Sequence, residues 1–143
     1  MDIQTELQGD LLLVTLTGKV DLSSSVRLLN QAFDIAAETH AYKVLFNGLA
    51  ATGSLSTLER YELGSKVAAH VTQLRTNPKI AFVGVSPTVN GFAVRVAQNR
   101  DIAVELFRDV SEGLAWLSKW PAPEKPGSIS PQVLLILLAL SPS

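Results

Sequence analysis

Short apolar runs rich in strand-forming residues alternate with longer amphipathic segments, and this alternation limits the fold more than any single motif does. The apolar runs lie at 11–16, 42–46, 79–83 and 104–107. The segments between them carry apolar residues at helical spacing, which is typical of helices that connect parallel strands. Such connections are right-handed and bring the strands into one sheet. The sequence therefore predicts an α/β fold.

The first apolar run is preceded by a further predicted strand. Residues 2–8 alternate loosely between polar and apolar, and Gly9-Asp10 offers a tight turn before the run begins. This pattern predicts a β-hairpin, which gives the sheet one antiparallel pair. We therefore expect a single domain over residues 1–120, with the order ββαβαβαβα and a mixed, mostly parallel sheet flanked by helices.

Capping residues mark the expected helix starts. The serines at 23–25 are N-cap candidates for a first helix over about 23–38. Ser56-Thr-Leu-Glu59 fits the capping box and predicts a second helix that continues to a stop at Asn77-Pro78. The strand before this second helix is expected to end at Asn47-Gly48.

The last two helices have similar start signals. Ser86 is the expected N-cap of the third helix, with Pro87 as its first helical residue. Asp109 and Glu112 repeat the capping-box spacing at the start of the fourth. Each of these helices is predicted to turn an apolar face toward the sheet.

Residues 121–143 differ in character from the rest. Pro121, Pro123, Pro126 and Pro131, with Gly127 and nearby serines, make a linker that is incompatible with continued helix. The apolar run at 133–140 is under half of the roughly 20 residues that a membrane-spanning helix needs, so stable membrane anchoring is not expected. We expect this tail to be poorly ordered. Three interpretations of its apolar run remain open: it docks on the domain, it mediates self-association into a homodimer, or it has no function.

Charge and cysteine content exclude several classes of function. Twelve Lys and Arg against thirteen Asp and Glu give a net charge of -1. No long-range field then attracts nucleic acid. The sequence has no cysteine, which excludes disulfides and thiolate chemistry and fits a reducing compartment. The N-terminal residues do not resemble a secretory signal, so cytoplasmic localisation is expected.

Catalytic and metal-binding motifs are not recognisable. His40 and His70 are the only histidines, and neither has a partner at ligand spacing. No phosphate-binding glycine motif accompanies the glycines at 48 and 53. We therefore expect no enzymatic activity, no cofactor and no metal. The turn before the third helix offers candidate anion or ligand contacts, which are Ser86, Asn90, Gly91 and Arg95.

Two stretches carry a resemblance to a known family. The segment LLLVTLTGKVDLSSSVRLL, at 11–29, is similar to the strand-Gly-x-Val-Asp-helix opening of STAS domains, the family of bacterial anti-sigma factor antagonists. Residues 79–117 resemble the last two strand-helix units of that family. The resemblance covers residues 1–118 and implies a STAS-like fold and a protein partner of anti-sigma factor or kinase type. The neighbouring Sec14-like subset is also similar.

The resemblance implies a regulatory position. Phosphorylated members of the family carry Asp-Ser-Ser-Gly at the start of the helix after the third strand. That motif falls on Leu55-Ser56-Thr57-Leu58, where both hydroxyls are kept and both flanking residues are leucine. The implied phosphoacceptors are Ser56, Thr57 and Ser54.

Two functions remain open at the level of the sequence. One is a non-enzymatic regulatory module that binds another bacterial protein through residues 52–66, with Leu55, Glu59 and Arg60 on the partner surface, and is switched there by phosphorylation. The other, implied by the Sec14-like resemblance, is the binding of a small apolar or anionic, lipid-like ligand. That ligand would lie between the sheet and the helices, near 54–57 and 86–91.

Overall fold

Nine elements make up the part of the chain that the computed structural model describes, residues 1–120. They are β1 (Asp2–Gln8), β2 (Leu11–Lys19), α1 (Leu22–Glu38), β3 (Lys43–Thr52), α2 (Thr57–Gln73), β4 (Lys79–Val83), α3 (Phe92–Gln98), β5 (Val104–Phe107) and α4 (Val110–Leu117). This order confirms the predicted ββαβαβαβα arrangement. The predicted linker and apolar tail lie outside the described residues.

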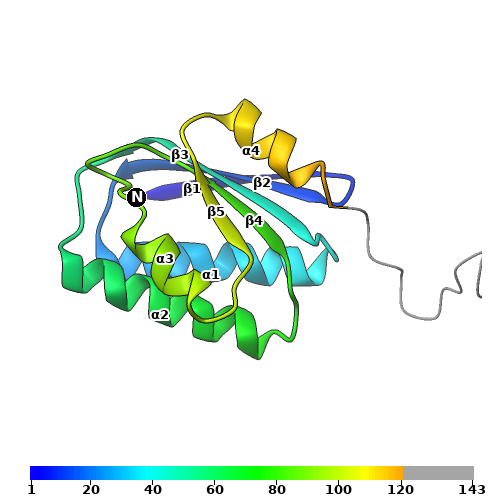
Figure 1. The fold of residues 1–143 in the computed structure, drawn as a ribbon, viewed down its shortest axis with the longest axis horizontal. Helices are drawn as coiled ribbons and strands as arrows, with labels where there is room; N and C mark the ends of the chain where they lie inside the picture. The colour runs from blue at the N-terminus through cyan, green and yellow to red at the C-terminus, as the bar shows by residue number, and fades with distance from the viewer. Residues whose placement is uncertain (121–143) are drawn as a thin grey trace, which may run out of the picture.

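The five strands form one mixed sheet in which their spatial order is the order of the chain, β1-β2-β3-β4-β5. β1 is antiparallel to β2, and the other neighbours are parallel. Because each right-handed crossover steps in the same direction, the connecting helices must all lie on one face. Figure 1 shows α1, α2 and α3 together on that face, with α4 alone on the opposite one.

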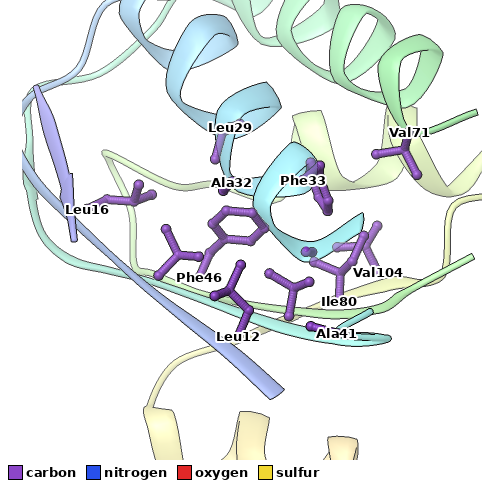
Figure 2. Packing of buried hydrophobic residues seen from close by; sticks show 13 residues of the cluster. Leu12, Leu16, Leu29, Ala32, Phe33, Ala41, Phe46, Val71, Ile80 and Val104 are labelled. Carbon is purple, nitrogen blue, oxygen red and sulfur yellow. The ribbon is translucent and has the colours of Figure 1, made fainter. Parts of the chain in front are cut away.

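The larger hydrophobic core lies between the sheet and the three connecting helices (Figure 2). Phe46 stands at its centre and is 1% exposed. Its ring centroid lies 5.3 Å from that of Phe33 on α1 and 5.5 Å from that of Phe82 on β4. A smaller cluster under α4 contains Leu45 and Leu117. The central strands β3 and β4 are thus covered on both faces, as parallel strands require, whereas the antiparallel edge strand β1 is mostly exposed.

The start of α3 differs from the prediction. The helix begins at Phe92, and its N-cap is Gly91 with a left-handed φ of 85°, so Ser86 and Pro87 are not its cap and first residue. The carbonyl oxygens of Pro87 and Thr88 accept hydrogen bonds from the Arg60 side chain. Those carbonyls are therefore engaged outside the helix, and residues 86–91 form a loop.

Smaller differences concern the ends of other elements. Asp21, and not the serines after it, caps α1, because its carboxylate accepts from the Ser24 backbone N–H at 2.8 Å. β3 continues past Gly48 to Thr52, where it remains paired with β2. α2 ends at Gln73, before the proline that was expected to stop it. The capping residue of α4 is Asp109, as predicted.

Gly64 sets how closely α2 and α3 approach. A Cβ atom at this position would lie 2.7 Å from the Ala93 carbonyl oxygen and 2.9 Å from the Val96 Cβ. Alanine normally stabilises a helix interior relative to glycine by about 1 kcal/mol, whereas overpacking costs about 1–3 kcal/mol. The clash is with backbone and a β-branched side chain, which cannot rotate away. We therefore expect the packing cost to outweigh the gain in helix propensity.

We therefore expect Gly64→Ala to lower the free energy of unfolding by up to about 2 kcal/mol. Urea denaturation followed by circular dichroism measures this. Ala69→Gly, at an exposed position of the same helix, gives the scale of the propensity effect alone. An increase in the midpoint for Gly64→Ala would contradict the close approach of the helices.

Candidate functional site

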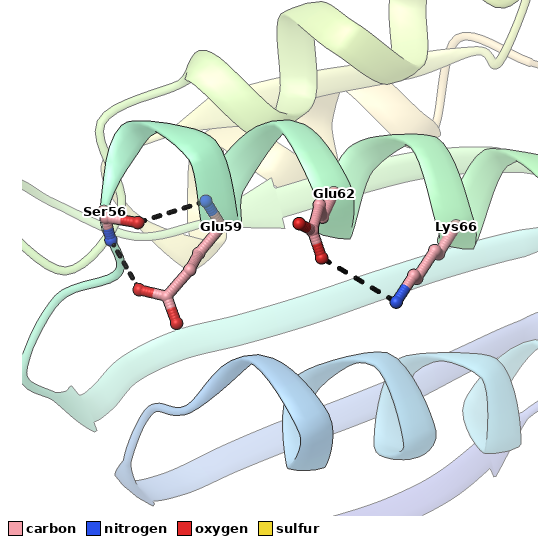
Figure 3. Close-up of polar contacts among 4 residues, drawn as sticks. All are labelled: Ser56, Glu59, Glu62 and Lys66. Carbon is pink, nitrogen blue, oxygen red and sulfur yellow. Dashed lines mark hydrogen bonds and ion pairs between the residues drawn. The ribbon is translucent and has the colours of Figure 1, made fainter.

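The N-terminus of α2 presents the three predicted phosphoacceptors. Ser54, Ser56 and Thr57 are all exposed. The Ser56 hydroxyl accepts from the Glu59 N–H at 3.1 Å, and the Glu59 carboxylate accepts from the Ser56 N–H at 2.9 Å. Figure 3 shows this capping box, which the sequence predicted, together with the exposed Glu62–Lys66 ion pair further along the helix. The hydroxyls are therefore accessible at a fixed helix start.

Two exposed apolar side chains follow these hydroxyls on α2. Leu58 is 67% exposed and Tyr61 is 46% exposed. They are three residues apart and therefore lie on the same side of the helix. Leu55 and Glu59, which the sequence placed on the partner surface, are half-buried. Leu58 and Tyr61 add an apolar contact area that the motif comparison did not reveal.

Tyr61 is also joined to the end of α3. The Arg100 guanidinium donates to the Tyr61 hydroxyl at 3.3 Å and lies 5.5 Å from the centre of its ring. This hydrogen bond, more than any other contact, lowers the pKa of the Tyr61 phenol from its usual value. Tyr61 is thereby held in place while almost half of it faces solvent.

Arg60 does not lie on the surface, although the sequence placed it on the partner surface. Arg60 is 7% exposed. Nε donates to the Leu55 carbonyl at 2.9 Å, Nη2 to the Pro87 carbonyl at 2.8 Å, and Nη1 to the Thr88 carbonyl at 3.3 Å. These three hydrogen bonds hold the side chain inside the protein, so Arg60 joins the α2 start to the 86–91 loop.

The second predicted group of contacts is divided by the structure. Gly91 is half-buried and lines an apolar cavity of about 120 Å³ between the sheet and the helices, and the exposed Asn90 reaches the same cavity. The Asn90 carbonyl oxygen accepts from the Phe92 N–H at 3.1 Å, which fixes the side chain. Ser86 is exposed and lines, together with Asn90, a separate and larger hollow of about 360 Å³. Arg95 is exposed and lines neither.

A cavity of about 120 Å³ lies between the sheet and the helices α1, α2 and α3. Its walls are mainly apolar and include Phe46 and Phe82 from the sheet. Polar groups reach it at few positions, among them Arg60, Thr88 and Asn90. A mostly apolar hollow with a few polar groups is the usual form of a small-molecule site. It lies where the sequence placed its ligand alternative.

The two histidines have structural positions. His70 Nε2 lies 2.6 Å from the Asp34 carboxylate, which links α2 to α1. His40 follows the end of α1 with a positive φ of 56°. Within residues 1–120, no three His, Asp or Glu side chains are grouped so that they could hold a metal ion. No helix in that same range is long and apolar enough to cross a membrane.

The fold matches solved structures, although the sequence matches no protein-family model and no curated protein. An anti-sigma factor antagonist from Mycobacterium paratuberculosis is 14% identical with a TM-score of 0.58, over 82% of this chain and 93% of that one. The anti-sigma factor antagonist SpoIIAA in its unphosphorylated form is 12% identical with a TM-score of 0.51, over 84% of this chain and 99% of that one. The predicted resemblance to STAS domains is confirmed at the level of the fold.

Proposed function

We propose that this chain, which has the STAS fold, is a non-enzymatic regulatory module of the anti-sigma factor antagonist type. The observation that carries the proposal is the exposed start of α2, where accessible hydroxyls adjoin Leu58 and Tyr61. Exposed apolar residues beside a modifiable group suit a protein partner. The partner proposed is an anti-sigma factor or a kinase-like protein of the bacterial cytoplasm, and a net charge of -1 argues against nucleic acid.

The proposed switch is phosphorylation of Ser56, with Thr57 and Ser54 as the other acceptors. A phosphate group with a charge of about -2 interacts favourably with the helix dipole at a helix N-terminus, so the fold should tolerate it. The same charge lies two residues from Leu58, on the proposed contact area. Its desolvation would oppose an apolar contact, and partner binding would change while the domain stays folded.

The capping box gives a stability test of this position. Ser56→Ala removes the acceptor of the Glu59 N–H and should cost about 1 kcal/mol. Ser56→Asp keeps an N-cap acceptor and adds the charge, so it should stay within about 0.5 kcal/mol of the wild type. Thermal denaturation compares both with Ser54→Ala, whose hydroxyl lies outside the box. A loss for Ser56→Asp as large as that for Ser56→Ala would contradict a switch that leaves the fold intact.

Affinity capture from extract of the source cells tests the function. Baits are the wild type, Ser56→Asp, Leu58→Asp and, as a surface control outside residues 52–66, Lys119→Asp, which is exposed after α4 on the opposite face. A stoichiometric partner held by the wild type and Lys119→Asp, and lost with the other two, supports the proposal. Intact mass of the bait reveals phosphate, and its native mass reveals a homodimer. Equal capture by all four baits would refute the α2 surface as the contact.

A second function is favoured by the cavity, namely the binding of a small apolar or anionic ligand. The mainly apolar walls are the supporting observation. Native mass spectrometry of the purified chain, followed by solvent extraction, tests whether a small molecule is carried. Protein capture and ligand carriage are separate measurements, so each function stands or fails independently.

A further inference from the structure

We propose that the cavity between the sheet and α1–α3 binds a small apolar carboxylic acid, whose carboxylate is held by Arg60. This inference rests on the second proposed function and names its ligand class. It draws on the size of the cavity, the chemistry of its walls and the unusual position of one cation.

The size of the cavity limits the apolar part of the ligand. Its volume is about 120 Å³, and an engineered apolar cavity of about 150 Å³ binds benzene. A nucleotide or a long acyl chain would need the roughly 300–1,000 Å³ of a drug-sized pocket. The walls include the Phe46 and Phe82 rings and the Leu63, Val67 and Val89 side chains. One aromatic ring or a short branched chain fits these limits.

The charge of the ligand follows from Arg60. A guanidinium has five N–H donors, and three donate to the Leu55, Pro87 and Thr88 carbonyls. Two N–H donors therefore remain at a residue that is 7% exposed and lines the cavity. No carboxylate within residues 1–120 forms an ion pair with it. A buried cation without a counter-ion is costly, so an anion that enters beside it is stabilised.

The geometry of Arg60 favours a carboxylate among the small anions. The three carbonyls hold the planar guanidinium in one orientation before any ligand binds, and planar forks match carboxylates. Asn90 lines the same cavity with its carbonyl oxygen already bonded to the Phe92 N–H. Its amide N–H₂ is then the group that can donate to a ligand. A neutral hydrocarbon would fill the cavity without using either group.

Benzoate and benzamide form the test pair, because they share a ring and differ in charge. Each is titrated into the ¹⁵N-labelled full chain at pH 7 and followed by NMR. We expect benzoate to bind about tenfold more tightly than benzamide, as one charged contact implies. Shifts should centre on Val67, Val89 and Gly91. Arg60→Gln should remove the preference, and Ala68→Leu, which places a larger side chain at the cavity wall, should abolish both titrations.

The outcomes separate the ligand class from the function beneath it. Equal binding of both compounds in the cavity overturns the carboxylate and leaves ligand binding standing. Absence of binding by either, or shifts confined to surface residues such as Arg95, overturns both. If Arg60→Gln fails to fold by circular dichroism, the benzoate preference of the wild type and its loss in Ala68→Leu decide the result.

Discussion

Replacing Phe46 by alanine should lower the free energy of unfolding by about 3–5 kcal/mol, the largest single effect expected in this chain. The ring is 1% exposed and contacts aromatic rings on both sides, Phe33 edge-on at 63° and Phe82 nearly stacked at 24°. Its removal enlarges a cavity that already exists, and the cost grows with the volume that the surrounding side chains leave unfilled.

Chemical denaturation with the wild type and two controls measures this effect. Leu58→Ala removes an apolar side chain that is 67% exposed, and it should change the free energy by less than about 0.5 kcal/mol. Phe46→Leu keeps most of the volume and should fall between the two. A Phe46→Ala loss below 1 kcal/mol would mean that this ring is not the centre of the core.

Replacing Arg60 by methionine should cost about 2–4 kcal/mol. Each hydrogen bond to a charged group contributes about 1.5–3 kcal/mol, and Arg60 makes three. The cost of burying the guanidinium offsets part of this sum. The Leu55, Pro87 and Thr88 carbonyls would lose their donor together. Arg60→Lys should rescue little, because one ammonium group cannot match a fork of fixed geometry.

The matched control is Arg95→Met, an exposed arginine on α3 that should change stability by less than about 0.5 kcal/mol. Hydrogen exchange adds a local readout, since loss of the Arg60 contacts should raise exchange in residues 86–91 and at the α2 start. Equal stability of the Arg60 and Arg95 variants would show that the three carbonyl contacts do not support the fold.

Elements with local signals were predictable from the sequence. The Ser56/Glu59 capping box, the Gly9-Asp10 turn and the Asp109 cap each depend on residues within three positions of one another. The parallel strands were predictable because strands that are buried on both faces appear in a sequence as continuous apolar runs. The predicted start of α3 at Ser86-Pro87 was wrong. The Pro87 and Thr88 carbonyls accept hydrogen bonds from Arg60, which is 27 and 28 residues away in the chain, and such a distant partner is not visible in the local sequence.

The candidate site was predictable only in part. The exposed hydroxyls of α2 follow from its cap. The burial of Arg60 does not, because arginine is ordinarily exposed and only the packed loop supplies its three carbonyl partners. The cavity likewise depends on seven elements, β2 to β5 and α1 to α3, meeting around an unfilled space. The family resemblance places a ligand between the sheet and the helices, but a single sequence does not predict the volume of the cavity there.

The agreement between spatial and chain order in the sheet bears on how the molecule forms during synthesis. Each strand that leaves the ribosome pairs with the strand made just before it, and no strand has to be inserted between two that are already paired. The β1–β2 pairing closes only the Gly9-Asp10 turn, and each later pairing closes a loop of one helix and its turns, which keeps the entropic cost of each step small. The sheet can therefore grow by accretion at a single edge, from β1 toward β5, in step with translation.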